Sequence, residues 1–523
     1  MAIVMGPILG FRGEDKVKGE WTVSALFVSD VDPGMLHFAV ADANNTQAMQ
    51  KTLLKEHKGH QVWRFDMQIE QSDKPVRIQY MLAGAEQKWA FWVPEKGVNP
   101  HIAYASCNGF SDPKYMKTVK NRNALWVDME ERHTFAIECL EAEDGTTDLP
   151  FNLLLMGGDQ VYADSIWQEK ECKPIYDWVN EPLDDRIKMP FSMEMKGSVE
   201  DFYFNLYCER WSQPEPARML ASIPTVMMWD DHDIFDGWGS YPEGVNKCDV
   251  YQGIFASARD NFRAFQMQLT DTEKPLWLVG GDNNFSMTHV AGDMAFAVFD
   301  MRSERTNDCV MSATAWNGIT NWLHDLAEGD AKHLFVMSSI PVVHMDFSKL
   351  ESILNAIPGQ QELEDDLRDH WHSHPHKIER LDMIRNLLTF SRDKKTRVTF
   401  LSGDVHVAAV GAIKSTREGV NSVKNSNVMN QLTSSAIVHP PPPGIVVWAM
   451  NKLMNENEVV DRDITAELLN FRGADCGLVG ARNWLSIEKF NAHNLIAKWH
   501  LEETGKGIKP PPYSKVISAC SAL

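Results

Sequence analysis

The chain has 523 residues, of which 44% are hydrophobic and 24% charged, and its formal net charge at pH 7 is −21. This composition is typical of a globular protein of two or three domains, and the acidity argues against broad binding to nucleic acid or to an anionic membrane surface. The opening residues lack the basic and apolar regions of a secretory signal, and no stretch approaches the ~18 uncharged apolar residues of a membrane span. The eight cysteines form neither a CxxC pair nor a dense framework, so we expect reduced thiols in a cytoplasmic protein.

Residues 1–100 are expected to form a small N-terminal antiparallel β-sandwich domain. Short apolar runs, several of them alternating with polar residues, are separated by turn residues, which is the pattern of such sheets. The runs lie at 21–28, 35–40, 61–69, 76–81 and 87–93. They carry no group of residues suited to chemistry, so a structural or lid-supporting role is expected.

Beyond residue 100 strand-like and helix-like segments are mixed, which indicates a layered α/β core. We expect strands at 102–105, 135–140, 151–156, 224–229, 285–290, 294–300, 334–341 and 398–401, and helices at 113–131, 249–268, 316–327 and 377–391. The segment 165–220 is rich in aromatic residues and is expected to be helical or irregular.

The end of this core is expected near residue 440. Prolines at 440–443 cannot continue a helix or a central strand. Strand-like runs return at 483–487 and 494–499. We therefore divide the chain into residues 1–100, a catalytic domain at 101–440, and a C-terminal segment at 441–523 that packs on or completes it.

Three apolar runs end in acidic residues or histidine. The run from Leu153 is followed by Asp159, the run 224–229 by an Asp-Asp-His-Asp sequence, and the run 398–403 by Asp-Val-His. Ligands gather at the carboxyl ends of strands in α/β folds, and carboxylate and imidazole groups suit hard or borderline cations. Each aspartate alone could equally cap a helix or a turn, but their recurrence at three strand ends favours one metal site. The predicted ligands are Asp159, Asp231, Asp404 and His406, with Cys107 or Asn108 as a further ligand from another strand end.

The same segments resemble the calcineurin-like metallophosphoesterases, and within them the PhoD-like (alkaline phosphatase D) family. The matching blocks follow the family's order, at 105–108, 158–162, 229–233, 299–302 and 402–406. The resemblance implies a layered metallophosphoesterase β-sandwich core flanked by helices, with a β-domain in front of it.

By position, the resemblance implies that Asp159 bridges two metal ions. Asp231 takes the place of an amide ligand, and His232 lies near the leaving group. In the late block Asp404 replaces the first of two histidines and His406 keeps the second.

The first block offers Cys107 and Asn108 in place of the superfamily's Asp-x-His, and this changes the metals expected. The resemblance implies two or more divalent or trivalent ions, with iron and calcium foremost and zinc, manganese or magnesium as alternatives. Tyr162 fits a phenolate ligand for ferric iron, or it simply packs.

Phosphoester hydrolysis needs neutralised phosphoryl charge and an activated, aligned water, which metal ions supply. His232 would protonate the leaving oxygen or hydrogen-bond to the phosphoryl group, and Asp233 would orient its imidazole. Arg302 would bind phosphate oxygens; the alternative for it is an ion pair with Asp300 or Glu304.

We therefore expect a metal-dependent hydrolase of a small-molecule phosphoester, either a monoester or a diester. Two other classes stay open: a catalytically silent metal-containing protein that binds a phosphorylated ligand, and a scaffold whose β-domain binds a partner protein, for which the aromatic segment 165–220 is the support. The histidine-rich stretch 370–376 would line the mouth of the site or hold a separate structural metal. The oligomeric state does not follow from the sequence.

Overall fold

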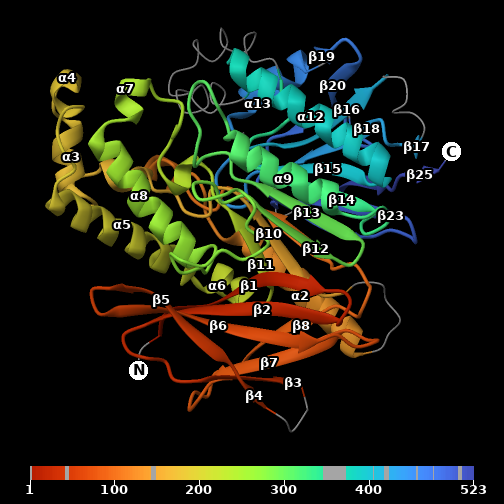
Figure 1. Ribbon diagram of the computed structural model, residues 1–523, viewed down its shortest axis with the longest axis horizontal. Coiled ribbons are helices and arrows are strands. Elements are labelled where there is room, and N and C mark those ends of the chain that lie inside the picture. Colours follow the sequence, from red (N-terminus) through yellow and green to blue (C-terminus); the bar gives the residue numbers. More distant parts are fainter. Residues whose placement is uncertain are drawn as a thin grey trace.

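The structure is a computed structural model of the 523-residue chain. It describes residues 3–41, 46–142, 149–345, 371, 373–403, 406–416, 423–454, 457–474, 476–503 and 509–522. Two large β-sheets and their flanking helices form most of the molecule (Figure 1).

The first sheet has strands from the beginning, the middle and the end of the chain. Its spatial order is β24 (Tyr513–Ser518), β23 (Asn494–Leu501), β22 (Asn483–Lys489), β9 (Ile102–Ala105), β10 (Leu153–Gly157), β11 (Thr225–Met228), β1 (Ile3–Asp15), β2 (Glu20–Ser29), β6 (His60–Glu70) and β5 (Gln50–His57). The central strands β9, β10, β11 and β1 are parallel to one another, and the outer pairs are antiparallel. The carboxyl ends of β9, β10 and β11 therefore meet at one edge of the sheet.

The second sheet is also mixed. Its order is β12 (Met287–Ala291), β13 (Met294–Phe299), β14 (His333–Ser338), β15 (Arg397–Ser402), β18 (Val428–Thr433), β16 (Ala408–Ser415), β20 (Ile464–Leu469) and β19 (Glu458–Asp461), with β21 (Leu478–Val479) also paired to β16. Two smaller sheets contain β4 (Gln47–Ala48), β3 (Leu36–Val40), β7 (Val76–Leu82) and β8 (Trp89–Val93), and β17 (Val423–Lys424) and β25 (Ser521–Ala522).

The strands are buried on both faces, and alternate residues enter different apolar clusters. Leu155 of β10 and Phe296 of β13 lie in one cluster between the sheets. Leu154 lies in a second cluster with α2 (Ala124–Glu141), α5 (Met193–Trp211) and α6 (Pro214–Leu220). Leu334 lies in a third with α9 (Ala313–Asp325) and α12 (His374–Lys394), which cross the second sheet in Figure 1. Because period-two alternation separates these clusters, each central strand contacts the opposite sheet on one face and helices on the other.

In the described parts of the chain, the remaining helices are short apart from α8 (Asp249–Phe265), which packs into the cluster between the sheets. They are α1 (Pro113–Met116), η1 (Asp164–Trp167), α3 (Lys173–Val179), α4 (Leu183–Arg186), η2 (Asp231–Asp233), α7 (Glu243–Asn246) and α13 (Gly444–Leu453). The expected helical character of 165–220 is present, and α13 begins directly after the prolines at 440–443.

The first hundred residues share a sheet with the rest of the chain. The expected strands are present as β2, β3, β6, β7 and β8, but β1, which was not predicted, pairs with β11 through Gly10 and Thr225. The four-stranded sheet packs against this shared sheet, since Phe38 and Phe91 lie in the same cluster as Phe27. The sheet therefore has no break at residue 100, and the division at 100 and 440 stays a prediction.

One expected strand is wrong. Residues 135–140 lie in α2, where Ala136 and Cys139 are buried while Phe135 is 55% exposed. Burial at a spacing of three is that of a helix, and a short apolar run does not distinguish the two structures.

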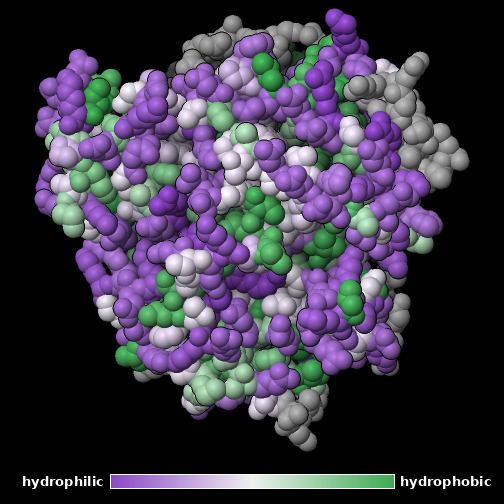
Figure 2. All heavy atoms as spheres, in the orientation of Figure 1, coloured by the Kyte–Doolittle hydropathy of each residue, from purple (hydrophilic) through white to green (hydrophobic). Residues whose placement is uncertain are grey.

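Among the described residues, no helix is both long and apolar enough to cross a bilayer. On the face shown in Figure 2 hydrophilic residues predominate, and hydrophobic residues form small separate patches.

Candidate metal centre

Loops from both large sheets meet beyond the carboxyl ends of β9, β10 and β11. The loop after β9 is joined to the loop after β10, because Asn108 N donates to the carbonyl oxygen of Asp159 at 2.8 Å. It is also joined to the segment after β18, since Ser106 Oγ donates to the carbonyl oxygen of Ser434 at 2.9 Å. Gly403, at the end of β15, donates its N–H to Ser339 O at 3.3 Å. Segments far apart in the sequence are thus fixed around one space.

Asp159 is turned into this space by a tight loop. Gly158 has φ +108°, and a Cβ there would lie 3.0 Å from Asp230 Cβ and 3.2 Å from Ser339 Cβ. Asp159 itself is left-handed, with φ +56°, a conformation that aspartate tolerates better than most residues. Its side chain is 3% exposed, and its Oδ1 has no hydrogen-bond partner among the described residues.

Three buried carboxylates converge here. Ligand oxygens of Asp159, Asp230 and Asp231 all lie within 4.8 Å of one another. Burial raises the pKa of the Asp159 carboxyl well above its usual range; the nearby His232 opposes this shift and the other aspartates add to it. Three carboxylates this close together, one of them with an unpaired oxygen, would be stabilised by a bound cation. An all-oxygen donor set fits a hard or borderline metal ion.

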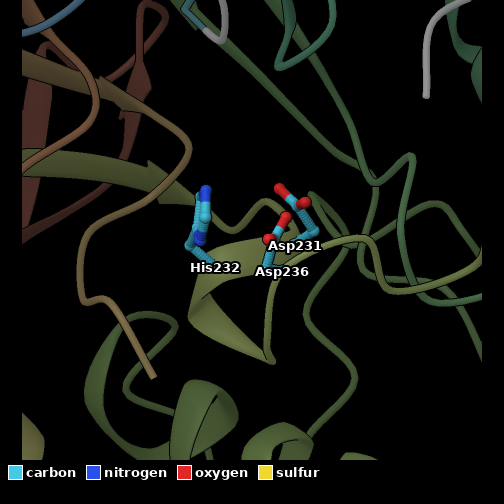
Figure 3. Close-up of side chains that lie close together, drawn as sticks. All are labelled: Asp231, His232 and Asp236. Atoms are coloured by element: carbon cyan, nitrogen blue, oxygen red, sulfur yellow. The ribbon is translucent and has the colours of Figure 1, made fainter. Parts of the chain in front are cut away.

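A second group shares one of these carboxylates. Asp231, His232 and Asp236 also offer ligand atoms within 4.8 Å of one another. All three come from the turn after β11, and their side chains lie beside one another around one space (Figure 3). Asp231 thus belongs to both groups, and its Oδ2 is held by Gly237 N at 2.8 Å.

Arg302 pairs with two of the three aspartates, Asp230 and Asp231. Its Nε donates to Asp230 Oδ1, and its Nη2 lies 3.3 Å from Asp231 Oδ1. The side chain is 1% exposed. Asp300 instead accepts from Trp229 Nε1 at 2.8 Å. The guanidinium of Arg302 therefore pairs with Asp230 and Asp231, and Asp300 accepts from Arg302 only at the backbone N, at 3.2 Å. The contact of Arg302 with phosphate stays a prediction.

The imidazole of His232 is oriented by Asp164 and not by Asp233. Asp164 Oδ2 lies 2.9 Å from His232 Nδ1, so Nδ1 carries the hydrogen, and Asp164 Oδ1 accepts from Asp236 N at 2.9 Å. Burial lowers the pKa of His232, but Asp164 and Asp231 outweigh it, and the net shift is well above the usual value.

Asp233 has a different task from the one expected. Its carboxylate accepts from the backbone N–H groups of Asp230 at 2.9 Å and Gln160 at 3.1 Å, and from Gln266 Nε2 at 2.9 Å. Burial raises the pKa of Asp233 to about 7, although these hydrogen bonds lower it. It ties the loop after β10 to the turn after β11.

Aromatic and imidazole rings line the other side of the carboxylates. Tyr162 Oη lies 3.4 Å from Asp159 Oδ2 and 3.5 Å from His406 Nε2. The ring of Tyr162 stacks on His232 with centroids 4.4 Å apart, and His406 stacks on His439 at 3.8 Å. Burial lowers the pKa of His406 far below its usual value and that of His439 to about 3. Both rings are therefore neutral near pH 7, which is the form that binds metals.

The two ligands expected from the loop after β9, Cys107 and Asn108, have different surroundings. Cys107 is fully buried, with Sγ 3.1 Å from Ser435 Oγ and in apolar contact with Tyr162. The amide of Asn108 is engaged on both sides: its oxygen accepts from Trp126 Nε1 at 2.9 Å and from Arg210, and its Nδ2 donates to Gln160 O at 3.3 Å. Asn108 therefore holds the loop, which leaves it poorly placed to bind a metal. Asp404 lies outside the described residues.

Four residues of the site were not predicted as site residues, namely Asp164, Asp230, Asp236 and His439. Asp164 and Asp236 stand within five residues of predicted ligands, so the density of carboxylates around each strand end was the available signal. In the histidine-rich stretch, 370 and 372 lie outside the described residues, and His376 Nε2 pairs with Thr306 O at 2.8 Å.

The family model for PhoD-related phosphatases matches residues 147–360 and 348–460. The uncharacterized protein YGR266W of Saccharomyces cerevisiae is 24% identical over 481 residues, covering 77% of this chain; the chain spans 66% of that protein's length. Among solved structures, PhoD has a TM-score of 0.57 at 13% identity, covering 99% of this chain and 91% of its own. The purple acid phosphatase PPD1 from yellow lupin (Lupinus luteus) seeds has a TM-score of 0.51 at 11% identity, covering 98% and 74%. These two solved structures share the mixed α/β fold of this chain. The family model covers more than half of the sequence, which shows that the chain belongs to the PhoD-related phosphatase family.

Proposed function

We propose that the protein hydrolyses phosphoesters with the help of metal ions held by Asp159, Asp230 and Asp231. The observation that carries this proposal is the convergence of three buried carboxylates within 4.8 Å, one of them with an unpaired oxygen. A cluster of this kind is costly for a fold to keep unless a cation binds it. When bound, such ions would neutralise phosphoryl charge and activate the attacking water.

The chain's own groups have distinct tasks in this proposal. Asp164 holds the His232 imidazole so that its other nitrogen faces the reacting groups, where it donates a hydrogen bond or a proton to the leaving oxygen. Arg302 positions Asp230 and Asp231. His406 and Tyr162, beside Asp159, complete the ligand set.

The metals proposed are iron and calcium. Calcium prefers carboxylate and carbonyl oxygens, which Asp159, Asp230 and Asp231 provide. The phenol of Tyr162, beside Asp159, and the buried thiol of Cys107, in the same apolar cluster as Tyr162, add donors suited to iron. Elemental analysis of protein purified without chelators tests this assignment; zinc or manganese alone would overturn it.

The activity is tested with an aryl phosphate and a bis-aryl phosphate, which separate monoesterase from diesterase action. Asp231→Asn and His406→Ala should each lower kcat/KM by roughly 100-fold or more, because each removes a ligand. Asp325→Asn, on an exposed side chain, is the matched control and should be as active as wild type.

Wild-type rates in a folded Asp231→Asn protein would contradict the proposal. Saturable binding of a phosphoester without turnover, with any metal tested, would instead favour a silent binding protein.

A further inference from the structure

The loop between β9 and α2 leaves the metal centre and is closed by one buried arginine. Asn108, at its start, belongs to the loop that is joined to Asp159, and Asn123, at its end, directly precedes α2. Arg210 holds both ends, since its Nε donates to Asn108 O at 2.7 Å and its Nη1 donates to Asn123 Oδ1 at 3.1 Å. We call the residues between them, 110–122, the basic loop.

The basic loop packs against the rings that line the carboxylates. Ser111 Oγ lies 3.1 Å from His439 Nε2, and the ring centroids of Tyr115 and His439 are 5.0 Å apart. His439 in turn stacks on the predicted ligand His406, with centroids 3.8 Å apart. One ring therefore separates the basic loop from a predicted ligand, and the loop borders the metal centre.

The far end of the basic loop is held beside the same segment. Arg482 donates from Nη2 to Asn121 O at 2.9 Å and from Nη1 to Arg122 O at 3.0 Å. The same Nη1 lies 3.4 Å from the carbonyl oxygen of Val438, the residue before His439. Both halves of the basic loop are thus fixed against residues 438–439.

The basic loop carries more positive than negative charge. Its one carboxylate, Asp112, lies 3.0 Å from the ammonium group of Lys114, so these two offset each other. Lys117, Lys120 and Arg122 are exposed and make no ion pair with any residue that the structure describes. Three cations beside the metal centre are therefore left for an anion to neutralise.

The arginine beneath the loop adds to this charge. The hydrogen bonds of Arg210 go to amide and carbonyl oxygens and not to a carboxylate; the acceptors belong to Asn108, Asn123 and Gln213. Burial lowers the pKa of Arg210 to about 9, Arg122 adds to the shift, and Glu215 opposes it. The guanidinium groups of Arg210 and Arg122 are thus close enough for their charges to interact.

A local excess of positive charge bears on which substrates reach the metal ions. The chain as a whole has a net charge of −21, which repels anions with several charges. Metal ions at the carboxylates would compensate the phosphoryl group that reacts. Cations beside them and outside that group suit a second anionic group on the same substrate.

We propose that the basic loop binds a second phosphate group of the substrate, so that the preferred substrates are small phosphoesters with a phosphate in addition to the one hydrolysed. This inference rests on the proposed function and names the substrate class of the same site. The second phosphate would contact Lys117, Lys120 and Arg122, which are outside the metal-binding residues.

Glucose 6-phosphate and glucose 1,6-bisphosphate test this, because they differ by one phosphate. Release of inorganic phosphate gives kcat and KM, and isothermal titration calorimetry gives binding of both compounds to the full chain. The test variant combines Lys117→Gln, Lys120→Gln and Arg122→Gln. Phosphatidylcholine vesicles with and without phosphatidylinositol 4-phosphate, added as competitors, distinguish a lipid headgroup from a free compound as the source of the second phosphate.

The matched control removes the same number of charges elsewhere. It combines Lys74→Gln, Lys88→Gln and Lys96→Gln, which are exposed and lie in the first hundred residues. Melting temperatures of both triple variants check folding. If the test variant melts early, Lys117→Gln alone is compared with Lys88→Gln alone.

Wild type should prefer the bisphosphate, and the test variant should lose at least about tenfold in kcat/KM for the bisphosphate, mainly through KM, and about twofold for the monophosphate. The control variant should keep the preference. Because the cations are exposed, raising NaCl from about 0.05 M to about 0.5 M should reduce the preference of wild type toward that of the test variant.

Two results would overturn the inference: a test variant that discriminates between the two sugars as wild type does, by rate and by binding, or a control variant that loses the preference equally. Failure of wild type to hydrolyse either sugar would overturn the proposed function alone. Calorimetry would then still decide the role of the basic loop, by tighter binding of the bisphosphate in wild type than in the test variant.

Discussion

Buried carboxylates near the metal centre fall into two kinds. Asp233 and Asp300 accept hydrogen bonds from backbone and side-chain N–H groups, so the fold itself compensates their charge. Asp230 and Asp231 also accept hydrogen bonds, from Ser339 Oγ at 2.9 Å and from Gly237 N at 2.8 Å, and both pair with Arg302. Asp159 differs from them, because its Oδ1 has no hydrogen-bond partner among the described residues. A bound cation would compensate this oxygen, whereas hydrogen bonds already compensate Asp233 and Asp300. No sequence pattern encodes the number of donors around each carboxylate, and metal binding by Asp159 stays a proposal.

The separate partners of Asp164 and Asp233 predict different effects for two conservative substitutions. Asp164→Asn removes the charge behind His232 but keeps an acceptor for Nδ1, so kcat should fall about 10- to 100-fold with little change in KM. It turns an amide N–H toward one backbone donor, Asp236 N, so its loss of stability should be smaller than that of Asp233→Asn, which faces several donors. Asp233→Asn turns an amide N–H toward backbone donors and should cost roughly 1–3 kcal/mol of stability. Steady-state kinetics and denaturant unfolding of both variants measure this. Equal losses of kcat and stability in the two would contradict the separate roles.

At the scale of single elements, the turn after β10 requires glycine at position 158 for two reasons, its positive φ and the lack of space for a Cβ. Gly158→Ala should cost about 1–3 kcal/mol and lower activity, because its Cβ would press on Asp230 and displace the carboxylates. Gly329 has a similar φ, +92°, but nothing within 4 Å of its Cβ, so Gly329→Ala reports backbone strain alone. Chemical unfolding and kcat/KM of the pair separate the two effects. A Gly158→Ala protein no worse than Gly329→Ala would show that the contact is relieved without consequence.

The hydrophobic pattern of the sequence predicts those elements whose pattern is complete within their own residues. Alternation placed β2, β6 and β7, and the apolar runs before acidic residues placed β10, β11 and β15. It failed for 135–140, where exposed Phe135 belongs to a helix, and for β1, whose glycines and proline interrupt the pattern. Three of the predicted ligands, Asp159, Asp231 and His406, lie around one space, and their binding of metal stays a prediction. The pattern misjudged Asn108 and Asp233, because their partners Arg210 and Gln266 come from distant helices and loops.

At the scale of the whole molecule, the first hundred residues share a sheet with the rest of the chain. β1 pairs with β11, and β2 and β6 continue the same sheet. A chain of residues 101–523 would expose the edge of β11 and lose the apolar cover that Leu9 and Phe27 give. We expect it to show no cooperative melting transition, as measured by calorimetry. A cooperative transition with retained hydrolase activity would establish residues 1–100 as a separate domain.

Buried histidines far from the metal centre should make the molecule sensitive to mild acid. Burial lowers the pKa of His133 to about 4, of His289 to about 3 and of His333 to about 4, from 6.5. Between pH 6.5 and the lowered pKa of each histidine, the unfolded chain binds more protons than the folded chain. The contribution of each histidine to the free energy of unfolding is therefore fully present above pH 6.5. Below pH 6.5 it falls by up to about 1.4 kcal/mol per pH unit. His289 packs between Phe11 and Trp277, so His289→Phe keeps an aromatic ring and removes one titration. Denaturant unfolding at about pH 7 and about pH 5 should show a loss of stability smaller by about 2 kcal/mol in this variant than in wild type. An identical loss in the two proteins would mean that His289 is protonated without unfolding.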